Sequence, residues 1–146
     1  MMSLRFASVA AFALMVLGIV WMGATGQIVG RSVPIIAVQA GAVLLMIWAR
    51  IAFGRRSFHA AANPTAGGLV TTGPYAFIRH PIYAAALYFV WAAAADYRTL
   101  PAVGGAVLVS VGAAARMYSE ERLLLGMYPD YAAYSARTAR VVPFLV

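Results

Sequence analysis

Residues 81–115 read PIYAAALYFVWAAAADYRTLPAVGGAVLVSVGAAA, and this stretch decides the fold. It holds two apolar runs, 81–95 and 99–115, separated only by Asp96-Tyr97-Arg98. Each run approaches the roughly 20 residues that cross the hydrocarbon core of a bilayer as an α-helix. The polar residues between them leave room only for a tight turn. The sequence therefore predicts an antiparallel hairpin of two transmembrane helices.

Two more apolar runs precede the hairpin. Residues 6–22 lie in the uncharged stretch between Arg5 and Arg31, and residues 33–49 lie between Arg31 and Arg50, with Trp48 placed as an interfacial aromatic. The first run also resembles a cleavable signal peptide, because a basic residue precedes it and small residues follow it. It is long for a signal peptide and further spans follow, so we expect an all-α polytopic membrane protein with about four transmembrane helices.

Composition agrees with a chain that sits in lipid. Hydrophobic residues make up 64% of the 146 residues and charged residues only 10%, and the mean hydropathy is +0.83. Soluble globular domains average roughly 45–50% and 25%. The net charge of +7 comes from arginines scattered between apolar runs, which favours an anionic membrane face over nucleic acid as the partner.

The rest of the chain divides into two parts. Residues 1–53 hold the two N-terminal spans, and residues 54–146 hold a polar loop (54–73), the hairpin and a C-terminal segment. The second hairpin helix is expected to continue past the membrane through residues 117–127, because helix formers follow without a breaker before Pro129. The C-terminal segment is therefore predicted to be helical and cytoplasmic.

Arginines set the expected orientation. With four spans and a cytoplasmic N-terminus, two arginines lie outside, Arg31 and Arg98, whereas nine lie inside: Arg5, Arg50, Arg55, Arg56, Arg79, Arg116, Arg122, Arg137 and Arg140. Positive charge concentrates on the cytoplasmic side of membrane proteins. Both termini and the polar loop are predicted to be cytoplasmic.

The hairpin also brings polar residues together at that side. Counted from the turn near Tyr97, His80 lies about 17 residues before it and Ala114 about 17 after it, both roughly 25 Å along the helix axis. His80 is thus predicted level with Arg116, and the Gly73–Tyr75 segment level with Glu120-Glu121. By themselves such residues also fit a purely structural role, in which arginines anchor lipid headgroups and glutamates lie on a solvated helix face.

The order of the motifs favours a more specific interpretation. Residues 69–83 read LVTTGPYAFIRHPIY, and Glu120-Glu121, Tyr128-Pro129-Asp130-Tyr131, Tyr134, Arg140 and Pro143 follow. Over about residues 63–144 this pattern resembles the isoprenylcysteine carboxyl methyltransferase family and its phospholipid methyltransferase relatives. Residues before this range carry no resemblance that we recognise.

The resemblance implies an integral-membrane methyltransferase that uses S-adenosylmethionine. It implies a cofactor site made of Gly73, Pro74, Tyr75, Arg79, His80, Tyr83, Glu120, Glu121 and Tyr131. It also assigns Arg116 and Glu121 to catalysis, with Arg116 in the acceptor region. No Gly-x-Gly-x-x-Gly motif follows a strand, which excludes the usual soluble methyltransferase fold.

The expected substrate is a lipophilic acceptor that enters laterally from the bilayer. O-methylation of a carboxylate such as prenylcysteine is favoured, with N-methylation of an aminophospholipid and a non-enzymatic scaffold as the alternatives. The chain has no cysteine and two histidines without acidic neighbours in sequence, so we expect no metal. Nucleic acid is not expected as a partner.

Overall fold

The computed structural model describes residues 2–54 and 68–143. Within these ranges the elements are helices, and no strand occurs, which confirms an all-α membrane protein. They are α1 (Met2–Ala24), α2 (Val33–Phe53), the short 3₁₀ helix η2 (Gly73–Ala76), α3 (Pro81–Tyr97), α4 (Leu100–Met127) and α5 (Tyr131–Arg137). Residues 55–67 of the predicted polar loop lie outside the described residues.

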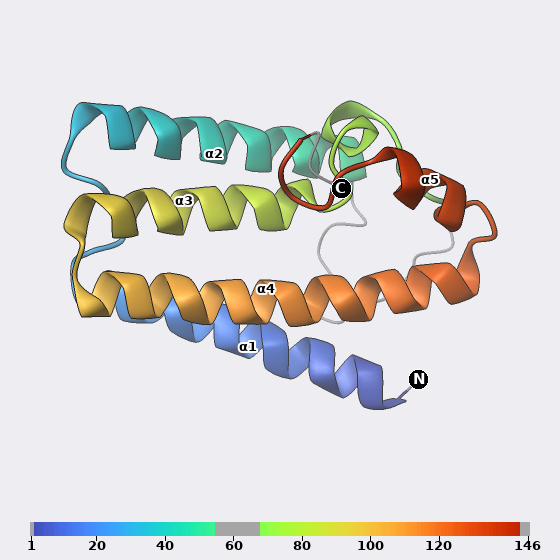
Figure 1. The fold of residues 1–146 in the computed structure, drawn as a ribbon, viewed down its shortest axis with the longest axis horizontal. Coiled ribbons are helices and arrows are strands. Elements are labelled where there is room, and N and C mark those ends of the chain that lie inside the picture. The colour runs from blue at the N-terminus through green and yellow to red at the C-terminus, as the bar shows by residue number, and fades with distance from the viewer. Residues whose placement is uncertain (1, 55–67, 144–146) are drawn as a thin grey trace.

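The four long helices lie side by side (Figure 1). Helix α1 packs against α4, α4 against α3, and α3 against α2. The α1–α2 and α3–α4 connections lie at one end of the bundle, and the N- and C-terminal ends lie at the other (Figure 1). The predicted hairpin is therefore present as α3 and α4, and both chain ends point the same way.

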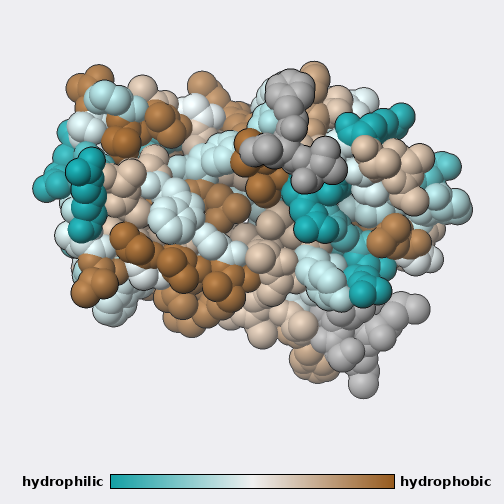
Figure 2. Space-filling view, in the orientation of Figure 1, coloured by the Kyte–Doolittle hydropathy of each residue, from teal (hydrophilic) through white to brown (hydrophobic). Residues whose placement is uncertain are grey.

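Among the described residues, three helices are long and apolar enough to cross a membrane, at Phe6–Ala24, Val33–Phe53 and Leu100–Met127. Helix α3 has 17 residues, about 25 Å at 1.5 Å per residue, slightly less than the roughly 30 Å hydrocarbon core. Its role as a further span stays a prediction. Hydrophobic side chains spread along the helices and the most hydrophilic ones gather toward the two ends (Figure 2).

Local sequence explains where the helices begin and turn. Helices α2, α3 and α4 each carry proline in the first turn, where its missing N–H and fixed φ fit a helix start. The side chain of Thr99 accepts a hydrogen bond from the Ala102 N–H and caps α4. Arg98 ends α3 in the left-handed conformation, φ 54°. The turn between the helices is consequently very short.

Small residues bring α1 and α4 into close contact. Gly18 of α1 faces Gly105 of α4, and Gly112 of α4 faces the Ala11 carbonyl. Small residues let helix backbones approach closely in lipid, where van der Waals packing drives association. This contact holds α1 beside α4, whose C-terminal half carries the candidate site.

Substituting Gly112 by alanine should weaken this contact. A Cβ there would lie 2.5 Å from the Ala11 carbonyl oxygen, whereas a Cβ at Gly104 would meet nothing within 4 Å. We expect Gly112→Ala to cost about 1–3 kcal/mol, as overpacking does. Gly104→Ala should be neutral or stabilising, because alanine favours a helix by about 1 kcal/mol over glycine. Thermal unfolding in detergent checks both, and equal midpoints would contradict the close contact.

Candidate active site

The segment before α3 places the Gly-Pro-Tyr motif against α2. Gly73 has φ 61°, a left-handed conformation that glycine adopts without strain. A Cβ there would lie 3.0 Å from the Ala52 side chain and 3.3 Å from the Trp48 indole nitrogen. Tyr75 is buried, with its ring centroid 5.5 Å from that of Phe53. The motif thus packs against the C-terminal end of α2.

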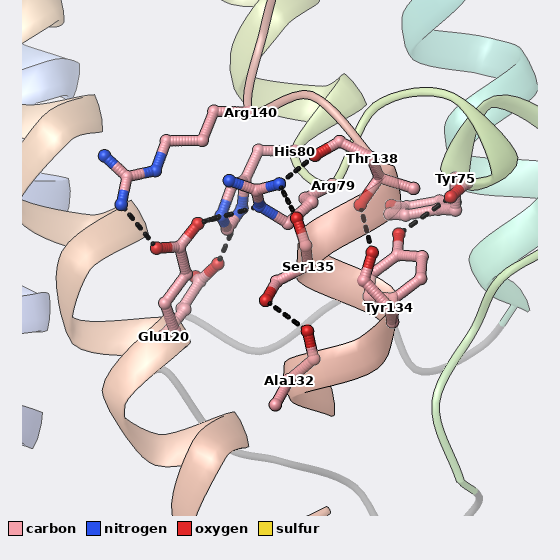
Figure 3. Close-up of polar contacts among 10 residues, drawn as sticks. Tyr75, Arg79, His80, Glu120, Ala132, Tyr134, Ser135, Thr138 and Arg140 are labelled. Atoms are coloured by element: carbon pink, nitrogen blue, oxygen red, sulfur yellow. Dashed lines mark hydrogen bonds and ion pairs between the residues drawn. The ribbon is translucent and has the colours of Figure 1, made fainter. Parts of the chain in front are cut away.

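The C-terminal segment folds back onto the residues that lead into α3. The Arg79 N–H donates to the Ala139 carbonyl at 2.7 Å, and the His80 N–H donates to the Arg140 carbonyl at 3.1 Å. The Tyr134 hydroxyl donates to the Tyr75 carbonyl at 2.7 Å. These bonds join the Gly-Pro-Tyr turn, the Arg-His pair and α5 into one unit (Figure 3).

Arg79 lies at the centre of this unit. Its Nη1 donates to the carbonyls of Ser135, at 2.7 Å, and of Thr138, and its Nε lies 3.2 Å from Glu121 Oε1. The Arg79 and Glu121 side chains are 7% and 13% exposed. Arg140, on the exposed side, pairs with the second oxygen of Glu121 at 3.0 Å. Glu121 is therefore held between two guanidinium groups.

His80 lies between the two glutamates of α4. Its Nε2 is 3.1 Å from Glu121 Oε1, and its Nδ1 is 3.7 Å from Glu120 Oε2. The imidazole is 5% exposed, and its ring packs against Tyr83 with centroids 5.7 Å apart. One buried histidine thus connects the two carboxylates.

One turn further into the bundle, Tyr83 and Arg116 form the deeper part of the network. Arg116 Nε donates to the Tyr83 hydroxyl at 2.6 Å, and that hydroxyl donates to Glu120 Oε1. Arg116 Nη2 lies 3.3 Å from the same Glu120 oxygen. Helix α1 completes this part, because Arg116 donates to the Ser8 carbonyl at 3.4 Å and lies 5.2 Å from the Phe12 ring centroid.

Tyr131 brings an unsatisfied hydroxyl to the network. The side chain is 2% exposed, and its hydroxyl has no hydrogen-bond partner among the described residues. Burial raises the pKa of Tyr131, with a contribution from the nearby Glu121 charge, and burial raises the pKa of Tyr134 to about 12. Both hydroxyls are protonated at neutral pH and available as donors. A buried unpaired donor of this kind costs stability unless a ligand or water satisfies it.

Most of the predicted site residues lie close together. Arg79, His80, Tyr83, Glu120, Glu121 and Arg116 form one network, and Tyr75 joins it through Tyr134. The observed register of α3 against α4 differs from the predicted one by about one turn. His80 was predicted level with Arg116, but it faces Glu120 and Glu121, and Tyr83 contacts Arg116 instead. Side chains tilt toward the N-terminus of their own helix. In an antiparallel pair this tilt moves each α3 residue toward later residues of α4.

Sequence reasoning missed three contributors. Arg140 belongs to the resembling pattern, but it was not assigned to the site, whereas the resemblance implied that the segment up to Tyr134 folds back onto the cofactor pocket. Ser8 and Phe12 lie in an apolar helix with no motif, and only packing of α1 on α4 brings them to Arg116. No pattern in the sequence signals Ser8 or Phe12.

Comparison with known proteins identifies the family. The family model described as phospholipid methyltransferase matches residues 28–131, more than half of the chain. The match includes α2, where the sequence showed no recognisable resemblance. No curated protein and no solved structure matched the chain. The chain belongs to the phospholipid methyltransferase family.

Proposed function

We propose that this membrane methyltransferase uses S-adenosylmethionine to methylate an amine on a lipid that approaches from the bilayer. Family membership supports methyl transfer in a membrane. The observation that supports the proposal most strongly is that the buried polar network has two groups of residues, one suited to the cofactor and one to the acceptor. Arg79, Glu121 and Tyr131 lie beside the C-terminal segment, whereas Tyr83, Glu120 and Arg116 lie on the side where Arg116 contacts α1.

The first side fits the cofactor. S-adenosylmethionine carries a carboxylate, an ammonium group and ribose hydroxyls, and its sulfonium supplies an electrophilic methyl group. The Tyr131 hydroxyl, which has no partner among the described residues, can donate to the carboxylate or to a ribose hydroxyl of the cofactor. Arg79 and Arg140 supply guanidinium groups that can pair with the carboxylate. Glu121 can accept hydrogen bonds from the ammonium or the ribose. Gly73 and Tyr75 pack against α2 and support this side of the site from behind.

The residues of the chain contribute alignment and exclusion of water more than covalent chemistry. Methyl transfer needs the two reacting groups held in line, and burial of the network keeps water out. Arg116 orients both Tyr83 and Glu120 through its Nε and Nη2 groups. His80 links the two sides, since one of its nitrogens faces each carboxylate.

Side-chain exposure on the second side favours an amine acceptor. The Glu120 side chain is 23% exposed and that of Arg116 only 6%. A lipid headgroup that reaches this point therefore meets a carboxylate first, with the guanidinium behind it. An ammonium or amine pairs favourably with Glu120, whereas a carboxylate is repelled by it.

O-methylation of a carboxylate such as prenylcysteine remains the second candidate. The observation in its favour is the buried Arg116, a guanidinium at the bilayer side of the network and the group that would pair with a carboxylate. In this function Arg116 would leave Glu120 for the acceptor. The two candidates differ in the proton that an amine must lose, which gives them different dependence on pH.

We also propose that the site and both chain ends face the cytoplasm, on the basis of the arginine asymmetry. The chain contains no cysteine, so a single introduced cysteine is the only thiol that a labelling reagent can modify. Ala133→Cys, exposed on α5, should react with an impermeant maleimide only in inverted vesicles. Leu100→Cys, 89% exposed at the opposite end, should react in intact cells. The reverse pattern would place the site outside.

Binding of S-adenosylhomocysteine tests the proposed function and separates it from a non-enzymatic scaffold. Calorimetry on the detergent-solubilised chain should give a micromolar dissociation constant, about −8 kcal/mol. Tyr131→Phe should weaken binding by about 1 kcal/mol, because the unpaired donor is lost. Absence of binding by a folded protein would support the scaffold and refute the proposal.

A further inference from the structure

We infer that Tyr83, Glu120, His80 and Glu121 form a proton path, which carries the proton of an amine acceptor from the bilayer side of the site to the cytoplasmic surface. The inference rests on the proposed function, because only an amine acceptor has a proton to lose. It assigns to His80 a task beyond holding the cofactor or joining two helices.

The four groups are in sequence along the network. The Tyr83 hydroxyl donates to Glu120 Oε1, and the other oxygen of Glu120 lies 3.7 Å from His80 Nδ1. On the far side of the ring, His80 Nε2 lies 3.1 Å from Glu121 Oε1. An imidazole can accept a proton at one nitrogen and release another from the second nitrogen. The contact with Glu121 already has hydrogen-bond length, and the 3.7 Å contact with Glu120 has to shorten for the proton to pass.

The path begins in the bundle and ends near water. Tyr83 and Glu120 contact Arg116, and the Arg116 guanidinium lies 5.2 Å from the ring centroid of Phe12 in α1. At the other end, Glu121 pairs with Arg140, whose side chain is 62% exposed. The imidazole, at 5% exposed, thus lies between two more exposed carboxylates, Glu120 at 23% and Glu121 at 13%, and only Glu121 pairs with the arginine at the surface.

The charged and titratable side chains around His80 come from three elements. Glu120 and Glu121 approach from α4, and the Tyr83 ring covers the imidazole from α3. Arg79, next to His80 in sequence, binds the same Glu121 oxygen, and Arg140 of the C-terminal segment binds the other. Two arginines therefore keep Glu121 charged and oriented toward the ring.

The site must release one proton to water for each methyl group that it transfers to the amine. A lipid ammonium, R–NH3⁺, releases H⁺ to Glu120, either directly or through the Tyr83 hydroxyl, and leaves the amine with a lone pair. That lone pair forms the new N–C bond while the S–C bond of the cofactor breaks, giving R–NH2⁺–CH3. His80 takes the proton from Glu120 at Nδ1 and releases the proton on Nε2 along its hydrogen bond to Glu121. Because Arg79 and Arg140 stabilise the Glu121 carboxylate, Glu121 holds that proton only transiently before it reaches water.

A pair of variants separates proton transfer from cofactor binding. Glutamine at position 80 can keep a hydrogen bond to Glu121 through Nε2, but it cannot exchange protons between two nitrogens. We expect any loss of S-adenosylhomocysteine affinity in His80→Gln to be smaller than its loss of turnover measured at saturating S-adenosylmethionine. Its turnover with phosphatidylethanolamine in mixed micelles should fall about a hundredfold, the usual contribution of proton transfer. Added imidazole should restore part of the turnover of His80→Gly, a residue that fits this non-helical position.

Three results would overturn the inference. One is full turnover by His80→Gln with retained binding. Another is a His80→Gly variant that binds S-adenosylhomocysteine but gains nothing from imidazole. The third is a wild-type protein that binds S-adenosylhomocysteine and methylates a farnesylcysteine carboxylate but no amine. Failure of the wild-type protein to bind S-adenosylhomocysteine at all would refute the proposed function itself, together with the path built on it.

Discussion

Arg79→Ala is expected to weaken cofactor binding at least about a hundredfold. The guanidinium holds the Ser135 and Thr138 carbonyls of the C-terminal segment and neutralises Glu121 together with Arg140. Breaking a buried ion pair costs about 3–5 kcal/mol, and we expect the lower end of this range because Arg140 still pairs with Glu121. Affinity for S-adenosylhomocysteine, measured by calorimetry, should therefore fall at least about a hundredfold. Arg79→Lys should recover only part of it, since an ammonium lacks the planar fork.

Arg122→Ala is the matched control for Arg79→Ala. Arg122 lies on α4 next to Glu121, but it is exposed and donates to Tyr118, outside the network. Its loss should change affinity and stability by less than about 0.5 kcal/mol, as surface substitutions usually do. If both alanine variants lost affinity equally, α4 as a whole would be sensitive and Arg79 would have no special role.

Glu120→Gln should separate the acceptor from the cofactor. The change keeps the shape and the hydrogen bond from Tyr83, but it removes the charge that faces the acceptor. A charge-assisted hydrogen bond contributes about 1.5–3 kcal/mol, so kcat/KM for phosphatidylethanolamine should fall about 10- to 150-fold. Affinity for S-adenosylhomocysteine should stay within about threefold, because Glu121 and Arg79 are unchanged.

Arg116→Ala completes this experiment. With an amine acceptor it should lower kcat, because Glu120 and Tyr83 lose the group that positions them. With a carboxylate acceptor it should raise KM for farnesylcysteine, and Glu120→Gln should then be harmless or beneficial. That second pattern would move the assignment to carboxyl methylation.

The helical fold could be predicted because apolar runs and breakers mark it directly. The runs around Asp96-Tyr97-Arg98 predicted the hairpin, and helix formers up to Pro129 predicted the continuation of α4 through Met127. The spacing of residues from the turn also predicted that His80 and Arg116 lie in the same region. Side-chain tilt produced the one-turn offset, and a count of residues along the axis does not include it.

Other parts of the site depend on packing between helices, which no pattern in the sequence signals. The unpaired Tyr131 hydroxyl results from how α5 folds against α4, and the contacts of Ser8 and Phe12 result from glycine packing between α1 and α4. Exposure of Glu120 ahead of Arg116 is a property of the assembled helices. Sequence favoured a carboxylate acceptor, whereas this exposure supports an amine.

Transfer of labelled methyl groups from S-adenosylmethionine to phosphatidylethanolamine in reconstituted vesicles tests the central claim most directly. An amine with a pKa near the lysine value must lose its proton, so its reactive fraction rises nearly tenfold per pH unit between about pH 6.5 and 8.5. The proposed function predicts labelled lipid, formed at a rate that climbs in this way when chemistry limits turnover. No labelled lipid at any pH, or label appearing only in farnesylcysteine at a rate that is flat over this range, would contradict it.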